Sequence, residues 1–242
     1  MRLDKFLAHT GYGTRKEVKV LLKKKCVLVN GAIITKGDTI LKLDTDTVTV
    51  NDEVVHYQKF VYLMLNKPGG YLSATEDNHQ QTVIDLLDAD SQRFSPFPVG
   101  RLDKDTEGLL LLTNDGDLAH FLLSPKKQVH KTYYAKTAGV MDEADVKAFK
   151  EGIILEDGYE CLPATLDILS TTDDSSDVHI TISEGKFHQV KRMVLACGKE
   201  VSFLKRLTMG SLKLDENLKL GEYRPLTEQE LNGLKEFLPQ NS

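Results

Sequence analysis

Three carboxylates lie within five positions of one another in a short polar segment, residues 100–108. They are Asp103, Asp105 and Glu107, and Arg101 precedes them. Carboxylates can act as nucleophiles, and a pair of them can cleave a glycosidic bond. By charge alone, the same residues also fit a solvated surface loop. The segment is therefore predicted to carry chemistry only if its flanking elements hold it against a core.

Apolar runs on both sides of the segment supply such elements. Residues 97–99 (Phe-Pro-Val) precede it, and four consecutive leucines from Leu109 to Leu112 follow it. Apolar runs bounded by turn residues are typical of buried strands. Residues 114–116 (Asn-Asp-Gly) form a turn signal that ends the second strand. The polar segment is thus predicted to be a loop carried by core strands, where scaffolds place reactive groups.

Residues 100–116 read Gly-Arg-Leu-Asp-x-x-Thr-x-Gly-Leu-Leu-x-x-Thr-Asn-Asp-Gly. This wording resembles the signature of the RNA pseudouridine synthases, in the branch named after RsuA that modifies bacterial ribosomal RNA. The resemblance implies that Asp103 is the catalytic carboxylate. Asp105 and Glu107 do not fall on the catalytic position and are interpreted as loop or structural residues. The implied reaction turns uridine into pseudouridine without a metal or an organic cofactor.

Two further segments resemble family motifs. Residues 131–133 (Lys-Thr-Tyr) match a Lys-x-Tyr element, so the resemblance implies that Tyr133 is the active-site tyrosine, whose ring can stack on a displaced base. In the segment Gly-Lys-Phe-His-Gln-Val-Lys-Arg-Met, the family places the cationic partner of the catalytic Asp two positions after Gln. That position is Lys191, where many relatives have Arg, and Arg192 is the alternative. A Lys-Pro-Gly turn at residues 67–69 is expected to shape the site.

The first 57 residues are predicted to form a separate basic module. Residues 1–36 hold nine Lys and Arg against two carboxylates, a net charge of +7, which leaves −12 for the other 206 residues of a chain of net charge −5. Thr14 and Glu17 have the spacing of a capping box before a basic helix, and Asn30-Gly31 favours a tight hairpin turn. This order resembles the RNA-binding module of ribosomal protein S4. The resemblance implies that the helix lies on RNA phosphates, with a packing or dimerisation appendage as the alternative.

The residues predicted to contact RNA come from this helix and from the three motifs. A uridine inside a helix cannot be reached, so the target nucleotide must turn out of the RNA into the site. Arg101 is expected to help hold that nucleotide or its phosphate. The full set is Arg15, Lys16, Lys19, Lys23, Lys24, Arg101, Lys131, Lys186, His188, Gln189 and Arg192.

The predicted fold class is α+β, with the S4-like module at residues 1–57 and a catalytic domain at residues 60–242. The resemblance implies a mixed, mostly antiparallel sheet in the catalytic domain. A last helix is expected after Thr227, with Glu230 completing its capping box. Its buried face is expected to hold Leu231, Leu234 and Phe237.

Composition sets outer limits on the function. The chain is 40% hydrophobic and 28% charged, as in ordinary globular proteins. A run of about 18 apolar residues is missing, so a membrane span is not expected. The start of the chain lacks the apolar core of a signal peptide. Three unpaired cysteines favour a cytoplasmic protein with reduced thiols and disfavour a zinc site.

Several alternatives stay open at the level of sequence. The motif wording and the length favour small-subunit (16S) ribosomal RNA, or an assembling subunit, as the substrate, and the family expectation is a monomer. Sister enzymes that act on large-subunit (23S) RNA differ little in these motifs. A non-catalytic RNA-binding or ribosome-assembly factor and a carboxylate-pair glycosidase are the other classes, although the lack of Trp disfavours a sugar cleft. Asp103 could attack the ribose or remove a ribose proton to give a glycal.

Overall fold

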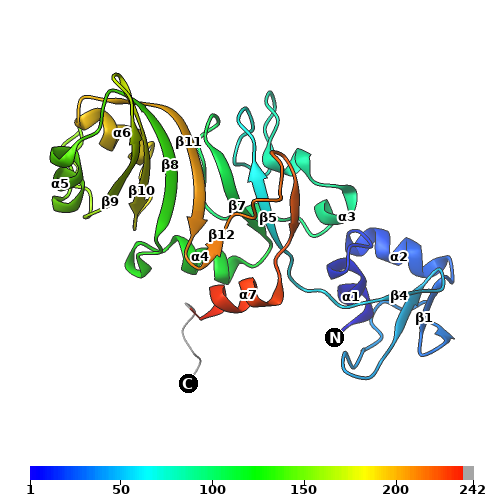
Figure 1. Ribbon diagram of the computed structural model, residues 1–242. Helices are drawn as coiled ribbons and strands as arrows, with labels where there is room; N and C mark the ends of the chain where they lie inside the picture. The colour runs from blue at the N-terminus through cyan, green and yellow to red at the C-terminus, as the bar shows by residue number, and fades with distance from the viewer. Residues whose placement is uncertain (237–242) are drawn as a thin grey trace. The chain divides into compact units, whose positions relative to one another are not determined.

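The computed structural model describes residues 1–236, which form two compact units (Figure 1). The first unit contains residues 1–61 and 87–96, and the second contains residues 62–86 and the chain from residue 97 onward. Segment 87–96, which includes α3 (Ala89–Gln92), therefore belongs to the first unit although it follows strand β5 (Tyr62–Lys67) of the second. No pattern in the sequence indicated this return of the chain.

The first unit is built from two helices and a four-stranded antiparallel sheet. The predicted capping box is confirmed, because the Thr14 amide donates to Glu17 Oε2 at 2.6 Å and the Glu17 amide to Thr14 Oγ1 at 3.4 Å. Asn30 and Gly31 have φ angles of 51° and 80°, which confirms the tight turn. The sheet order is β2-β1-β3-β4. The elements are α1 (Leu3–His9), α2 (Arg15–Lys23), β1 (Val27–Val29), β2 (Ala32–Ile33), β3 (Val48–Val50) and β4 (Glu53–Val55).

The second unit is organised around a nine-stranded sheet. Its main path runs β13-β5-β7-β11-β8-β10-β9, with β6 paired to β7 and β12 paired to β11. Among the described strands, β7 and β11 pair in parallel and every other pairing is antiparallel. This confirms the predicted α+β class with a mixed, mostly antiparallel sheet. The strands are β5 (Tyr62–Lys67), β6 (Phe97–Pro98), β7 (Glu107–Thr113), β8 (Lys131–Ala138), β9 (Thr165–Thr171), β10 (Ser175–Ile182), β11 (Glu200–Met209), β12 (Leu212–Lys213) and β13 (Tyr223–Pro225).

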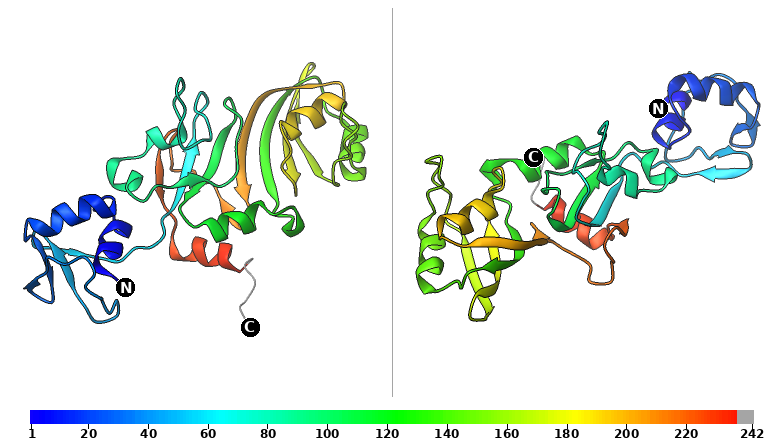
Figure 2. Two further views of the ribbon diagram at one scale, coloured as in Figure 1. Left: turned by 180° about the vertical axis from the view of Figure 1, so that it is seen from behind. Right: turned by 90° about the horizontal axis from the view of Figure 1, so that it is seen from above.

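Helices cover this sheet at different places. α5 packs against β9, α6 contacts β11, and α7 lies beside β12 (Figure 2). The capping box of Thr227 and Glu230 is confirmed at the start of α7, where Leu234 is buried, and Phe237 lies outside the described residues. No helix within residues 1–236 is long and apolar enough to span a bilayer. The helices are η1 (Val83–Leu86), α4 (Gly116–Leu123), η2 (Pro125–Lys127), α5 (Glu143–Glu151), α6 (Gln189–Ala196) and α7 (Glu228–Lys235).

Strand β7 lies in the middle of the core and carries the polar segment. The four leucines from Leu109 to Leu112 are fully buried, because the strand is covered on both faces. Two of them, Leu109 and Leu111, pack in the same cluster as Val99 and Met64. The polar segment, whose last two residues (Glu107 and Gly108) begin β7, is therefore anchored at both ends, as the apolar runs predicted.

Gly108 is required where β7 and β11 meet. Its φ is +99°, and a Cβ there would collide with the Arg206 carbonyl oxygen and lie 2.8 Å from the Arg206 nitrogen. We expect Gly108→Ala to lower the free energy of unfolding by about 3 kcal/mol, since left-handed strain and overpacking add. Gly116→Ala is the matched control, because its added Cβ meets nothing within 4 Å. Equal denaturation midpoints for the two variants would contradict this role of Gly108.

Candidate active site

A cavity of about 120 Å³ lies beside the polar segment. Its walls come from the loop before β7, from strands β8, β10 and β11, and from the loop that leads into α6. A wider groove continues from it past Ser73, Lys104 and Phe187. All three residues predicted to be catalytic line the cavity. The lining includes Arg101, Asp103, Thr106, Lys131, Tyr133, Ile182, Lys186, His188, Gln189, Lys191, Leu204 and Arg206.

Asp103 lies beside two cationic or potentially cationic groups. Lys191 Nζ is 3.2 Å from Asp103 Oδ2, and His188 Nε2 is 3.5 Å from Asp103 Oδ1. Lys191 also donates to both carboxylate oxygens of Asp105, at 2.7 and 2.9 Å. The structure thus brings Asp103 and Lys191 together, as the sequence predicted. Of the two carboxylates, Asp105, which the sequence analysis interpreted as a loop residue, forms the shorter bond to the Lys191 ammonium group.

The charges of this cluster stabilise one another. Burial opposes the positive charge of Lys191, but its hydrogen bonds to Asp105 and Asp103 outweigh burial and raise its pKa above the ordinary value. The hydrogen bond from Lys191 holds the pKa of Asp105 below its ordinary value. Lys191 is thus a charged donor shared by two carboxylates, of which Asp103 lines the cavity.

Arg192, the alternative partner of Asp103, is engaged elsewhere. Its Nε lies 2.8 Å from Glu156 Oε1, and its Nη2 lies 2.6 Å from Asp157 Oδ2. These two bonds hold the guanidinium against the segment that precedes β9. The geometry therefore favours Lys191 over Arg192 as the cationic partner of Asp103.

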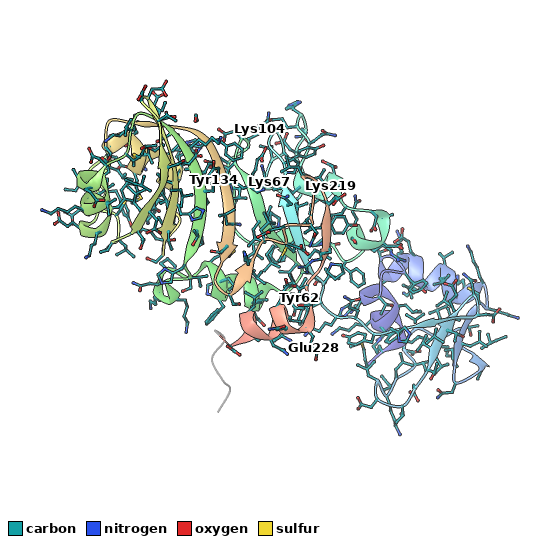
Figure 3. All side chains as sticks on the ribbon, in the orientation of Figure 1. Tyr62, Lys67, Lys104, Tyr134, Lys219 and Glu228 are labelled. Carbon is teal, nitrogen blue, oxygen red and sulfur yellow. The ribbon has the colours of Figure 1, made fainter. Side chains whose placement is uncertain are left out.

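Tyr133 forms part of the cavity wall through the alternation of β8. Side chains of successive strand residues point to opposite faces, so Tyr133 faces the cavity and is 8% exposed. Tyr134 (labelled in Figure 3) faces the other side of the sheet, where its ring forms edge-to-face contacts with the rings of His179 and Phe203. Leu204 and Ile182 add apolar surface to the same wall. The cavity thus offers an aromatic ring and aliphatic groups to a flat ligand.

Lys67 holds the backbone of the polar segment in place. This side chain, labelled in Figure 3 at the end of β5, is fully buried. Its Nζ donates to the carbonyl oxygens of Pro68 at 3.0 Å, Asp103 at 3.2 Å, Lys104 at 3.1 Å and Thr106 at 2.9 Å. Burial lowers the pKa of Lys67 to about 8. The sequence predicted only a turn at residues 67–69. The feature that could have indicated the role of Lys67 is its position at the end of a strand, directly before Pro68 and Gly69.

Glu184 braces the loop that leads into α6. It is 8% exposed and accepts hydrogen bonds from the Tyr159 hydroxyl at 2.6 Å, the Leu162 amide at 2.9 Å and Gln189 Nε2 at 2.7 Å. The bond to Glu184 raises the pKa of Tyr159 to about 12. Gln189 Oε1 in turn accepts from the Lys186 amide at 2.9 Å. Gln189, predicted to contact RNA, is therefore a buried brace, and an additional contact with RNA stays a prediction.

The other residues predicted to contact RNA occupy three kinds of position. Arg101 and Lys186 are exposed at the rim of the cavity, where Lys186 Nζ lies 4.8 Å from the centre of the Tyr159 ring. Lys131 is instead buried in the cavity, and its Nζ donates to the Val129 carbonyl at 2.9 Å. The basic side chains of the first unit are exposed on α2 or at its C-terminal end. They are Arg15, Lys16, Lys19, Lys23 and Lys24.

Substitution of Lys191 tests its placement. We expect Lys191→Met to slow the reaction at this site about 100-fold, the cost of removing one preorganised electrostatic partner. Lys191→Arg retains the charge and should lose less. Arg192→Met is the matched control, because Arg192 contacts Glu156 and Asp157 rather than Asp103. Single-turnover rates measure the effect, and a larger loss in Arg192→Met than in Lys191→Met would reverse the assignment.

Comparison with known families identifies the family of the chain. Residues 61–196 match the family described as RNA pseudouridylate synthase, and residues 1–48 match the S4 domain. The chain belongs to the RNA pseudouridine synthase family. The S4 match of this synthase lies within the first unit, and the synthase match covers residues of the second unit together with residues 61 and 87–96 of the first. Both matches confirm the predicted family and the predicted enzyme class.

Relatives of this synthase cover nearly its whole length. An uncharacterized RNA pseudouridine synthase of Bacillus subtilis is 52% identical over 98% of this chain and 99% of its own. A ribosomal small subunit pseudouridine synthase A of Haemophilus influenzae is 39% identical over 97% and 99% of the two chains. A ribosomal large subunit pseudouridine synthase B of Bacillus subtilis is 38% identical over 97% and 95%.

A solved structure shares the fold of the whole synthase. It is described as a crystal structure of pseudouridylate synthase, is 38% identical, and matches with a TM-score of 0.67 over 97% of this chain and 99% of its own. The near-equal identities to a small-subunit and a large-subunit enzyme leave the ribosomal subunit open.

Proposed function

We propose that this synthase converts one uridine of small-subunit (16S) ribosomal RNA to pseudouridine, with Asp103 as its catalytic carboxylate. The observation that carries the proposal is the position of Asp103 in the cavity, 3.2 Å from Lys191, with Tyr133 in the adjacent wall. Arg101 and Lys186 at the rim would contact phosphates of the flipped nucleotide and its neighbours. The exposed cations of α2 would add affinity without sequence readout.

The reaction moves the ribose from N1 to C5 of the same base, so product and substrate contain the same atoms. In one route Asp103 forms a bond to C1′ as the N1–C1′ bond breaks. In the other route Asp103 removes the proton of C2′, and the electrons of that C–H bond form a C1′–C2′ double bond. In both routes the electron pair of the N1–C1′ bond leaves with the base. The base then turns and C5 bonds to C1′. In the first route the bond from Asp103 to C1′ breaks as this bond forms, and in the second route Asp103 returns its proton to C2′ as the C1′–C2′ double bond is consumed. The proton of C5 is then lost as N1 gains one.

Each residue of the cluster has a separate part in this proposal. Lys191, 3.2 Å from Asp103, holds the carboxylate in its orientation until the base leaves. Tyr133 stacks on the base that has left the RNA helix, a contact that suits a half-apolar cavity. Binding of the base in this cavity excludes water from C1′ of the ribose.

The choice of small-subunit RNA rests on the sequence of the motifs and on the relative from Haemophilus influenzae. The alternative is a single site in large-subunit RNA, which the Bacillus subtilis relative supports. Both alternatives use the same chemistry and the same residues. A map of pseudouridines in both ribosomal RNAs separates them.

The test compares a strain that lacks this gene with the same strain complemented by the wild-type gene. Pseudouridines are located by carbodiimide-dependent stops of reverse transcription along both ribosomal RNAs. The proposal expects one stop in small-subunit RNA to be lost on deletion and restored on complementation. A stop lost from large-subunit RNA instead would move the protein to the sister specificity. Identical maps with and without the gene would refute the ribosomal function.

A further inference from the structure

Arg206 is a buried cation that the roles above do not use. It lies on β11 opposite Tyr133 of β8, lines the cavity and is only 2% exposed. Its Nε donates to the Leu109 carbonyl at 2.8 Å, but its buried Nη2 has no hydrogen-bond partner within the described residues. A buried donor without a partner costs about 1–3 kcal/mol, and more when it is charged. A buried cation with an unpaired donor is therefore a candidate for binding a ligand.

Two more donors lie in the same cavity. Lys131 is 8% exposed and uses its Nζ for one bond, to the Val129 carbonyl. Thr106 is 1% exposed, and its Oγ1 also has no partner in the part of the chain that the structure describes. Neither Lys131 nor Arg206 forms an ion pair with a carboxylate of that part of the chain. The inner end of the cavity is therefore positively charged and rich in donors.

A ligand that fits this end must be flat, must offer acceptors and gains from negative charge. The aromatic and aliphatic wall of Tyr133, Leu204 and Ile182 suits a base better than a phosphate. Uracil has two carbonyl oxygens, O2 and O4, as acceptors. Cytosine replaces O4 with an amino group, which would meet another donor. A site that offers only hydrogen-bond donors at this position therefore favours uracil over cytosine.

Resting on the proposed function, we propose that Arg206 and Lys131 bind the carbonyl oxygens of the flipped uracil and stabilise the negative charge that the base acquires when its N1–C1′ bond breaks. The departing base takes the electron pair of that bond and becomes a uracil monoanion. Its charge spreads over N1, O2, C5 and O4. Preorganised cations at the point where charge develops stabilise the transition state more than the neutral substrate.

The same pair of cations can serve the base before and after it turns. Rotation of uracil by half a turn about the line from N3 to C6 exchanges N1 with C5. It also exchanges O2 with O4. The carbonyl edge therefore keeps its shape and its acceptors, while the atom that faces the ribose changes from N1 to C5. Donors on that edge hold the anion in place without opposing the rotation that the reaction needs.

The test measures single-turnover rates with a ribosomal RNA fragment that the wild type converts. We expect Arg206→Met and Lys131→Met each to slow conversion about 100-fold, with unchanged affinity for the RNA. Lys205→Met is the matched control, because Lys205 precedes Arg206 on β11 and lines a different hollow with Leu207. Arg206→Lys keeps the charge and should recover part of the rate.

A second RNA with 5-fluorouridine at the target separates this role from a structural one. Fluorine withdraws electrons and stabilises the departing anion by itself, so the protein contributes less. We expect the rate loss of Arg206→Met, followed as disappearance of the parent nucleoside, to be several-fold smaller with 5-fluorouridine than with uridine. Both rates come from one preparation, so their ratio does not depend on the fraction of folded protein.

Each outcome bears on one claim. Equal losses on both RNAs, or full activity of both Met variants on uridine, would overturn the role of the cation pair while the wild-type activity stands. A smaller loss on 5-fluorouridine in both Met variants and an unaffected Lys205→Met would support it. A wild-type enzyme that converts no uridine in either ribosomal RNA would refute the proposed function itself.

Discussion

Asp103→Asn is expected to abolish pseudouridine formation while leaving the fold and the affinity for RNA unchanged. The amide has the size and shape of the carboxylate but can neither form the bond to C1′ nor accept a ribose proton. We expect a loss of at least about 1000-fold, the order seen when a nucleophile that acts with its partners is removed. Lys191 would still bond to Asp105, so the loop should keep its conformation. Carbodiimide-dependent stops in the complemented deletion strain measure the loss.

Asp105→Asn is the matched control for this prediction. Both carboxylates contact the same ammonium group, but Asp105 is 75% exposed at its side chain, whereas Asp103 is 25% exposed and lines the cavity. We expect Asp105→Asn to keep most of the activity. If Asp105→Asn were inactive and Asp103→Asn active, the catalytic role would pass to Asp105.

Local elements of this fold could be predicted from the sequence because local chemistry determines them. The capping box of Thr14 and Glu17 needs only the spacing of two side chains. The turn at Asn30 needs only residues that tolerate positive φ. The buried run of β7 is evident from its four leucines. The resemblance of the motifs then placed Asp103, Tyr133 and Lys191 in one site, and the structure does bring them together.

Other features of the site depend on contacts between distant parts of the chain. Glu184 bonds to Tyr159, 25 positions away, and neither residue is part of a recognisable pair in sequence. Lys205 and Arg206 are adjacent in the sequence, yet their side chains line different cavities, because successive side chains of a strand point to opposite faces. The buried position of Lys131 and Arg206 follows from strand pairing, which composition does not specify. The sequence analysis therefore treated Lys131 as a contact for RNA and gave Arg206 no role in the site.

Lys67→Met is expected to destabilise the second unit and to inactivate the enzyme together. Each charged hydrogen bond from Lys67 to a carbonyl oxygen contributes about 1.5–3 kcal/mol, and its ammonium has three protons to donate. Burial of the charge opposes them: a pKa lowered from 10.5 to about 8 corresponds to about 3 kcal/mol. Lys67→Met leaves the four carbonyl oxygens without this donor, and an unsatisfied buried acceptor costs about 1–3 kcal/mol, so we expect a net loss of about 2–5 kcal/mol in the free energy of unfolding. The loop that carries Asp103 would lose its main support.

The pH dependence of stability distinguishes this explanation from general damage. Between pH 8 and 10.5 the unfolded chain keeps a proton on Lys67 that the folded chain has lost, so the free energy of unfolding rises with pH through this group. The wild type should therefore gain about 3 kcal/mol relative to Lys67→Met across this window. Urea denaturation at pH 7.5 and 10.5 measures the difference. Lys213→Met, which loses only an exposed ion pair with Glu216, should change neither stability nor slope. Parallel pH profiles for wild type and Lys67→Met would show that Lys67 is not the buried cation that holds the Asp103 loop.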